Sequence, residues 1–325
     1  MANVSEEVPN IVNIDLDITN KKGENLSIDD GFIWVVRSFA FLTVALLFWI
    51  SWVIFDKARP AIAKFGLGFF WGKDWDVPNE IYGALPYIYG TIISSALSLI
   101  LAVPIGLAVA LVTSEDFLPD WVRSPIAFVV ELIAAIPSVI IGLWGIYVLI
   151  PFLTPLQDWL YNKFQFIPLF NTQSSGPSML IAGIILAIMI LPTMAAISRD
   201  VLLVIPRELR TGSMALGSTR WETIFRVLLP SGASGIVGAA MLALGRALGE
   251  TMAVTLVIGN SSVISSSLLD PGYSIPAVLA NEFPEAASAL HIGSLTYLAL
   301  ILFALTLAVN IGAVMLVQLL GVKKK

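Results

Sequence analysis

The chain has 325 residues, of which 57% are hydrophobic and only 13% are charged, with a formal net charge of −5. Soluble domains usually contain about 25% charged residues, so this composition is typical of a membrane protein with several spans. Because the sequence has no cysteine and one histidine, it excludes disulfide bonds, thiol catalysis and metal centres built from several histidines.

Residues 1–30 contain seven acidic residues and show no hydrophobic period. We expect them to form a mobile cytoplasmic tail outside the membrane. The apolar run that follows, residues 32–55, is longer than the core of a signal peptide and is predicted to be a retained spanning helix. Residues 31–85 are therefore interpreted as this first span followed by an outer loop.

A spanning helix needs ~20 mostly apolar residues, and six segments meet this requirement. They predict an all-α fold, a polytopic membrane helix bundle with six transmembrane helices. The last five spans lie within residues 86–320, and residues 321–325 form a basic tail. The predicted spans are about 32–55, 86–113, 125–152, 177–198, 231–260 and 290–320.

Lys and Arg are distributed unevenly between the two sets of connecting segments. If both termini lie in the cytoplasm, the inner segments carry 11 of these residues and the outer segments carry 5. Cytoplasmic loops of membrane proteins are enriched in Lys and Arg. The pattern therefore predicts a multi-pass protein with both termini in the cytoplasm.

The first outer connection is dense in Trp and Tyr over residues 69–90. Amphipathic aromatic rings favour the membrane interface, which predicts an aromatic belt with a short re-entrant stretch. Contact with an outer partner is the alternative interpretation. The single histidine, His291, begins the last span on the same side, and we expect it to have no specific role.

The segment 199–230 is too charged to span a membrane and carries signals for two short helices. Pro206 favours a helix start, and Gly217 favours a helix end because glycine adopts the left-handed conformation. Thr219 and Glu222 have capping-box spacing and predict a second helix. Four apolar residues of that helix fall on one predicted face: Trp221, Ile224, Phe225 and Leu228. The loop is either an interfacial amphipathic element or a docking element for a soluble partner.

The fifth predicted span contains two full charges, Arg246 and Glu250. An unpaired arginine at the membrane centre costs at least ~2.5–3.5 kcal/mol. Because the two residues are four apart, the carboxylate of a continuous helix reaches the guanidinium and offsets part of that cost. The span is also rich in small residues, including Gly245 and Gly249 at GxxxG spacing, which predicts close contact with another helix.

Two interpretations of the charged pair remain open. Either the pair fixes helix packing, or Arg246 binds an anion in transit, since its planar guanidinium matches the oxygens of phosphate-like anions. In the second interpretation Glu250 holds the arginine in place, keeps the empty site near neutral and favours release of the anion. Helical spacing places Thr251 and Thr255 away from the Arg246 face.

The loop 199–230 resembles the coupling loop of ABC-importer permeases, whose pattern is E-A-A-x3-G-x9-I-x-L-P. When Gly217 is aligned with the motif glycine, the last three motif positions are Val227, Leu229 and Pro230, and the E-A-A positions are Thr211, Gly212 and Ser213. The resemblance implies a type I ABC-importer permease core over residues 86–320. The residues that it assigns to contact with the ATPase are Arg207, Arg210, Thr211, Gly212, Ser213, Ala215, Gly217, Trp221 and Pro230.

Four stretches resemble the PstC-type permease subunits of phosphate-specific ABC importers: "WDVPNEIYGALPYIYGT" (75–91), "ELIAAIPSVIIGLWG" (131–145), "GRALGETMAVTLVIGN" (245–260) and "VLANEFPEA" (278–286). The resemblance covers the chain from about residue 65 to its end. It implies an inner-membrane subunit that moves phosphate inward by alternating access, with Arg246 and Glu250 as the residues important for translocation.

The same resemblance implies the partners. They are a second, homologous permease subunit, two ATP-binding subunits and an extracytoplasmic phosphate-binding protein, with the lipid bilayer as solvent and no nucleic acid. The chain lacks a GxxxxGK[ST] loop, so we expect no enzyme activity, no catalytic or metal-binding residue and no cofactor on this chain, with ATP and Mg on the partner ATPase. The alternatives are an importer of another oxyanion such as sulfate, an ion-gradient-driven anion carrier or channel, and a membrane scaffold.

Overall fold

The structure, a computed structural model, describes the backbone of residues 26–115 and 117–321 and the side chains of residues 31–115 and 117–318. Within these ranges the chain is helical and has no strand beyond two isolated β-bridges. The predictions for the acidic tail (1–30) and the basic tail (321–325) lie outside the described residues. The exceptions are 26–30 and Gly321, which belong to the first and last helices.

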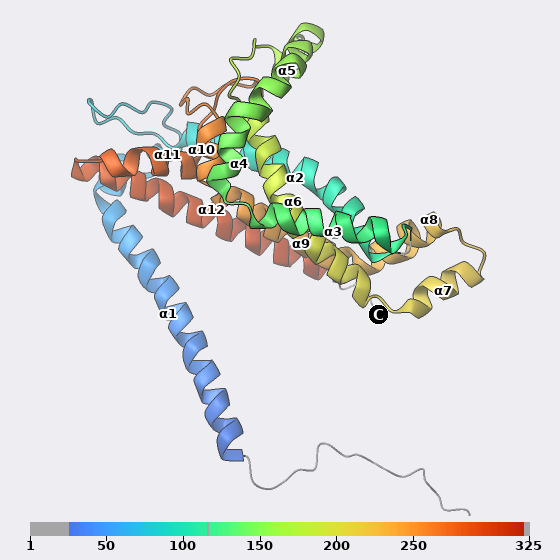
Figure 1. Ribbon diagram of the computed structural model, residues 1–325. Coiled ribbons are helices and arrows are strands. Elements are labelled where there is room, and N and C mark those ends of the chain that lie inside the picture. Colours follow the sequence, from blue (N-terminus) through green and yellow to red (C-terminus); the bar gives the residue numbers. More distant parts are fainter. Residues whose placement is uncertain (1–25, 116, 322–325) are drawn as a thin grey trace, which may run out of the picture. The chain divides into compact units, whose positions relative to one another are not determined.

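The helices follow one another along the chain as labelled in Figure 1. Those that lie in or next to the predicted spans are α1 (Leu26–Phe65), α2 (Leu85–Ser114), α3 (Asp120–Ala135), α4 (Ser138–Trp144), α5 (Ile150–Phe164), α6 (Met179–Val204), α9 (Leu229–Gly249), α10 (Met252–Val257) and α12 (Ala289–Gly321). The connections contain α7 (Arg207–Ala215), α8 (Arg220–Thr223) and α11 (Ile275–Glu282). Short 3-10 helices are η1 (Gly66–Phe70), η3 (Pro168–Phe170) and η5 (Phe283–Glu285), and π-helical turns are η2 (Gly145–Leu149) and η4 (Ile224–Leu228).

The prediction of six spans is confirmed, because six stretches of helix in the described part of the chain are long and apolar enough to cross a membrane. Four of the predicted spans match α1, α2, α6 and α12 within a few residues or lie inside a longer helix. The third and fifth predicted spans have different boundaries from those that hydropathy indicated.

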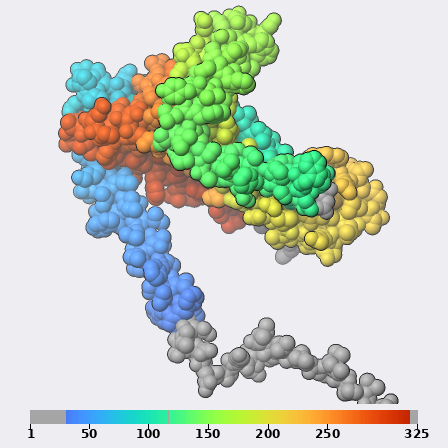
Figure 2. All heavy atoms as spheres, viewed as in Figure 1, coloured from blue at the N-terminus to red at the C-terminus, as the bar shows by residue number. Residues whose placement is uncertain are grey.

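The third predicted span, 125–152, is broken before Pro137. Ile136 has an extended backbone, with φ −73° and ψ 128°, and Pro137 directly precedes α4. A proline disfavours the helical conformation of the residue before it, so the apolar run becomes two helices. The spanning stretch is 138–164 instead, and α3 and α4–α5 run in different directions (Figures 1 and 2).

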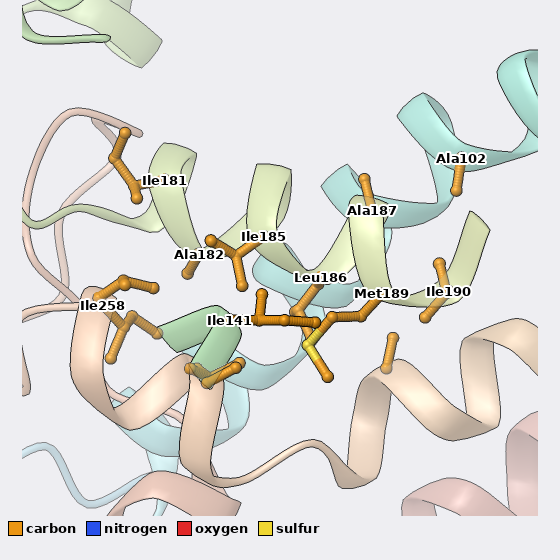
Figure 3. Close-up of a cluster of buried hydrophobic side chains, with 14 of the residues drawn as sticks. Ala102, Ile141, Ile181, Ala182, Ile185, Leu186, Ala187, Met189, Ile190 and Ile258 are labelled. Atoms are coloured by element: carbon orange, nitrogen blue, oxygen red, sulfur yellow. The ribbon is translucent and has the colours of Figure 1, made fainter. Parts of the chain in front are cut away.

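The chain divides into two compact units, residues 1–52 and 53–325. The described part of the first unit is the N-terminal part of α1, and every other helix lies in the second. The core of the second unit is built around α6, whose buried side chains point toward Ile141 of α4 and toward Ile258 (Figure 3). α2 and α6 approach closely, since a Cβ added to Gly183 would lie 2.5 Å from Cδ2 of Leu97.

Three aromatic residues of the predicted outer connection are buried in the chain, so the prediction of an aromatic belt is wrong for these three. Phe69, Tyr82 and Tyr87 are at most 3% exposed and pack in a cluster with residues of α11 and α12. Trp75 donates from Nε1 to a carboxylate oxygen of Glu282 at 2.8 Å. Because these rings are buried, residues 69–90 pack on one end of the second unit, and we call this segment the cap.

The expectation that His291 has no specific role is also wrong at the level of structure. His291 is 4% exposed, its Nε2 lies 3.0 Å from the same Glu282 oxygen, and its ring stacks on Tyr82. The histidine therefore joins the start of α12 to the cap. This contact depends on a carboxylate nine residues away and on a ring from another connection, neither of which sequence spacing reveals.

Candidate functional site

The site proposed from the sequence lies where the fifth span ends. α9 stops at Gly249, and Glu250 has an extended backbone with φ −69° and ψ 125° before α10 begins at Met252. Glycine is a poor helix former, so Gly245 and Gly249 weaken the last turns of α9. The Glu250 carboxylate accepts a hydrogen bond from the backbone N–H of Ala253 at 3.4 Å. It thereby satisfies an N–H group in the first turn of α10 that has no acceptor within the helix.

The predicted ion pair between Arg246 and Glu250 does not form among the described residues. Side chains four apart meet only when the helix between them is continuous, and α9 ends before Glu250. Arg246 instead donates from Nη1 to the hydroxyl of Thr193 at 3.2 Å. Thr193 follows Pro192 inside α6, and the sequence analysis missed it because it lies 53 positions away.

Arg246 lies on a face of α9 that the described chain does not cover. The side chain is exposed, Leu242 on the same side is 59% exposed, and a Cβ added to Gly238, Gly245 or Gly249 would meet nothing within 4 Å. An arginine facing lipid would be costly, so this face suits contact with another protein or with a water-filled path. With one neutral hydroxyl as partner, the guanidinium keeps most of its five N–H donors for an oxyanion.

Thr251 and Thr255 were placed away from Arg246 on the assumption of a continuous helix, and that assumption is wrong. Thr251 lies in the break between α9 and α10, and its hydroxyl donates to the carbonyl of Gly249 at 3.3 Å. Thr255 lies in α10 and donates to the carbonyl of Thr251 at 2.8 Å. Neither hydroxyl therefore contacts Arg246.

The segment 205–219 forms the predicted helix and glycine turn, which is confirmed. α7 begins one residue after Pro206. Gly217 has φ +88°, and the N–H groups of Gly217 and Ser218 donate to the carbonyls of Met214 and Ser213 at 3.0 and 3.3 Å. This pair of bonds is a Schellman motif, and its left-handed residue is the reason that glycine is favoured here.

The predicted capping box at the start of the second helix is also confirmed. The Thr219 hydroxyl accepts from the Glu222 N–H, and the Glu222 carboxylate accepts from the Thr219 N–H at 2.9 Å. From Arg220 the chain continues through η4 into α9 as one stretch of 30 residues ending at Gly249. The segment 205–219 is thus joined directly to the helix that carries Arg246. Pro230 lies in the first turn of α9.

The single apolar face predicted for the second helix is wrong. Ile224 and Leu228 are at most 2% exposed, whereas Trp221 and Phe225 are 59% and 61% exposed. The π-helical turn η4 changes the residue spacing, so a 3.6-residue period does not describe this segment. Phe117 stacks on Trp221 with ring centroids 5.4 Å apart, and this contact covers part of the exposed tryptophan.

The residues that the motif assigned to contact with an ATPase do not share one environment. Most of them are exposed on α7 and the turn after it: Arg207, Thr211, Gly212, Ala215 and Gly217. Ser213 is half-buried, and its hydroxyl lies 3.0 Å from that of Thr223, which ties α7 to α8. Three exposed apolar residues were not anticipated, and they make this surface suitable for docking: Leu209, Met214 and Leu216.

Arg210 is the exception, because it is held inside the chain. Its guanidinium forms an ion pair with Glu115 at 2.8 Å, and each of the two side chains is 16% exposed. It also donates to the carbonyls of Leu202 and Ile205 at 2.7 Å each. Arg210 therefore satisfies carbonyl groups at the C-terminus of α6 and fixes α7 to the end of α2.

The described residues contain no group of three or more His, Asp or Glu side chains that could hold a metal ion. The arrangement instead combines three features. They are a bundle with six candidate spans, an exposed arginine at the end of a spanning helix, and a rigid loop with exposed apolar side chains. Together these features are typical of a membrane transport protein.

Comparison with known proteins agrees with this class. Residues 102–322 match the family described as the binding-protein-dependent transport system inner membrane component. The chain belongs to this family of multi-pass transport permeases and, within it, to the permeases of the PstC type. The family description also implies that the chain acts with a binding protein and an ATPase.

Two relatives and one solved structure illustrate the similarity. The phosphate transport system permease protein PstC of Mesorhizobium japonicum is 44% identical over 86% of this chain and 86% of the relative. The protein of the same description from Pasteurella multocida is 42% identical over 86% of this chain and 88% of the relative. A crystal structure of a bacterial alginate ABC transporter shares the fold, with TM-score 0.57, 15% identity, and coverage of 89% of this chain and 96% of the other.

Proposed function

We propose that this chain is the permease subunit of an ATP-driven importer of inorganic phosphate. The observation that carries the proposal is the exposed Arg246, which has a single hydroxyl partner on an uncovered face of α9. A guanidinium in this state can bind two oxygens of a phosphate ion at once. The printed descriptions of the relatives at 42–44% identity support phosphate as the anion.

In this proposal Thr193 orients the guanidinium, replacing the role first assigned to Glu250. Glu250 retains a part in the site because its carboxylate caps α10 and so fixes where α9 ends after Arg246. The Glu250 carboxylate is four residues from Arg246 in the sequence, and its negative charge repels a bound anion and favours its release. Phosphate held by Arg246 would thus be bound loosely enough to leave on the cytoplasmic side.

The proposed partners follow from the surfaces. A second, homologous permease subunit would cover the face of α9 that carries Gly238, Leu242 and Gly245, since small residues let helices approach closely. Of the two ATP-binding subunits in the cytoplasm, one would dock on α7 of this chain through Leu209, Met214 and Leu216. The other would dock on the second permease subunit. An extracytoplasmic phosphate-binding protein would deliver the anion at the opposite end.

In this proposal both termini lie in the cytoplasm, which the bias of Lys and Arg supports. It assigns ATP and Mg to the partner ATPase and leaves this chain without enzyme activity or cofactor. Closure of the ATPases would move α7, and the continuous stretch Arg220–Gly249, ~45 Å long at 1.5 Å per residue, would carry that motion to Arg246. Alternating access would follow from the swing of this stretch.

The test is uptake of radiolabelled phosphate by vesicles that contain the whole transporter. We expect uptake to require ATP and the binding protein, and excess unlabelled phosphate to suppress it far more than excess sulfate. Suppression mainly by sulfate would assign a different oxyanion, and uptake driven by an ion gradient without ATP would refute the ATP-driven mechanism.

A further inference from the structure

A cavity of about 710 Å³ lies beside the coupling loop, between the end of α2, α3, the end of α6 and α7–α8. Figure 2 shows the surface of α3, in blue-green, against that of the α7–α8 segment, in gold. Five arginines line the cavity: Arg123, Arg199, Arg207, Arg210 and Arg220. Among the described lining residues, Glu115 is the one acidic side chain. Arginines therefore outnumber acidic side chains among the lining residues that the structure describes.

Two of these arginines are held by carboxylates within the chain. Arg210 is paired with Glu115, and Arg123 is paired with Asp120. The Glu115 charge is thus already matched by one guanidinium. Glu115 forms no ion pair with Arg199 or Arg207.

The guanidinium groups of Arg199 and Arg207 have no hydrogen bond or ion pair with the described residues. The Nε atom of Arg199 is buried and lacks a partner. A buried guanidinium N–H without an acceptor costs free energy, and nearby like charges raise that cost. Arg199 lies in the last turns of α6 and Arg207 at the start of α7, so the two flank the bend at Ile205–Pro206.

We propose that this cavity binds a phosphate-type oxyanion, either free inorganic phosphate or the phosphate of an anionic lipid headgroup. The planar guanidinium groups of Arg199 and Arg207 would bind its oxygens, and the hydroxyl of Ser124, which also lines the cavity, would add a donor. The bound anion would join α3, α6 and α7 across the bend and restrain the coupling loop.

This site is separate from Arg246. Arg246 lies 26 residues beyond Arg220 in one continuous helical stretch, ~39 Å along the axis. The proposal goes beyond transport of phosphate, because it concerns an anion that stays at the coupling loop. It also holds if the transported anion is not phosphate.

The experiment compares variants of the whole transporter, purified in nanodiscs, that assemble normally by size-exclusion chromatography. Binding of radiolabelled inorganic phosphate is measured by equilibrium dialysis at constant ionic strength, in the Arg246→Gln background so that binding at Arg246 is weakened. Anionic lipid retained by the same samples is counted by native mass spectrometry. The variant is Arg199→Gln with Arg207→Gln, and the matched control is Arg226→Gln, whose side chain is 79% exposed on η4.

We expect the double variant either to bind phosphate at least tenfold more weakly than the control or to lose a retained anionic lipid that the control keeps. The first result identifies free phosphate as the ligand, and the second identifies a lipid headgroup. The lysine double variant, Arg199→Lys with Arg207→Lys, keeps the charge and should show a smaller loss of the same ligand. If both double variants match Arg226→Gln in phosphate binding and in lipid content, the proposal is overturned.

Discussion

The pair of Arg210 and Glu115 gives the most precise prediction, because it connects the coupling loop to the bundle through one side chain. Arg210→Met would remove the ion pair and both hydrogen bonds to the α6 carbonyls while keeping an apolar stem. It would leave Glu115, which is 16% exposed, without its cation. Breaking a buried pair from one side costs 3–5 kcal/mol, and the remaining access to water places this case at about 3 kcal/mol.

Such a loss makes local opening of α7 more frequent by a predictable factor. A change of 1.4 kcal/mol is tenfold in an equilibrium constant, so about 3 kcal/mol corresponds to more than a hundredfold. The cleavage rate of the 205–219 segment by a protease reports this opening when closing is fast. The measurement uses the whole transporter in nanodiscs, with fragments quantified by mass spectrometry.

The matched control is Arg226→Met, which removes an exposed pair with Glu222 at 3.9 Å. We expect this change to cost no more than about 0.5 kcal/mol, as for other exposed pairs. Glu115→Gln combined with Arg210→Met should give a coupling energy of about 2 kcal/mol in a double-mutant cycle. A cleavage rate for Arg210→Met that equals that of the control would show that Arg210 does not hold α7.

Three further substitutions test the local structure. Gly217→Ala should destabilise the α7 turn by about 1 kcal/mol because φ is +88°, with faster cleavage of the same segment as the readout; an unchanged rate would contradict the left-handed turn. Gly183→Ala should lower the thermal unfolding temperature, at a cost of about 1–3 kcal/mol, because its Cβ would lie 2.5 Å from Leu97, whereas Gly312→Ala, whose Cβ would meet nothing within 4 Å, should not. Glu282→Leu should destabilise the cap by about 2 kcal/mol, since Trp75 and His291 lose their shared acceptor, and unchanged hydrogen exchange of the cap would argue against that role.

Much of the fold could be predicted because a bilayer imposes a simple rule on composition. Long apolar runs give spanning helices, and α2, α6 and α12 begin and end within a few residues of the predicted limits, apart from a longer C-terminal end of α6. The same rule cannot locate a break inside an apolar run. The run 125–152 was predicted to be one span, but the structure separates α3 from α4 before Pro137.

The local signals of the coupling loop were also readable, because capping and glycine turns depend on neighbouring residues. Gly217 and the Thr219 and Glu222 pair have the predicted geometry. The π-helical turn after Thr223 was not predicted, since no residue type specifies it, and neither was the exposure of Trp221 and Phe225.

The contacts of the candidate site were the least predictable part. Arg246 meets Thr193 from another helix, and Arg210 meets Glu115 across 95 residues of sequence. Spacing along one helix suggested Glu250 as the partner of Arg246, but that inference required α9 to continue past Gly249. Long-range pairing of this kind depends on how helices pack, which one sequence does not reveal.

The central claim is that Arg246 carries the transported anion, and the most direct measurement is ATP-driven phosphate uptake by the Arg246→Gln transporter in proteoliposomes. Assembly, checked by size-exclusion chromatography, and uptake by Arg226→Gln serve as controls. We predict that Arg246→Gln lowers uptake by at least a hundredfold while the complex remains intact, because a neutral amide cannot replace a bidentate cation. Uptake by Arg246→Gln equal to that of the wild type would contradict the account.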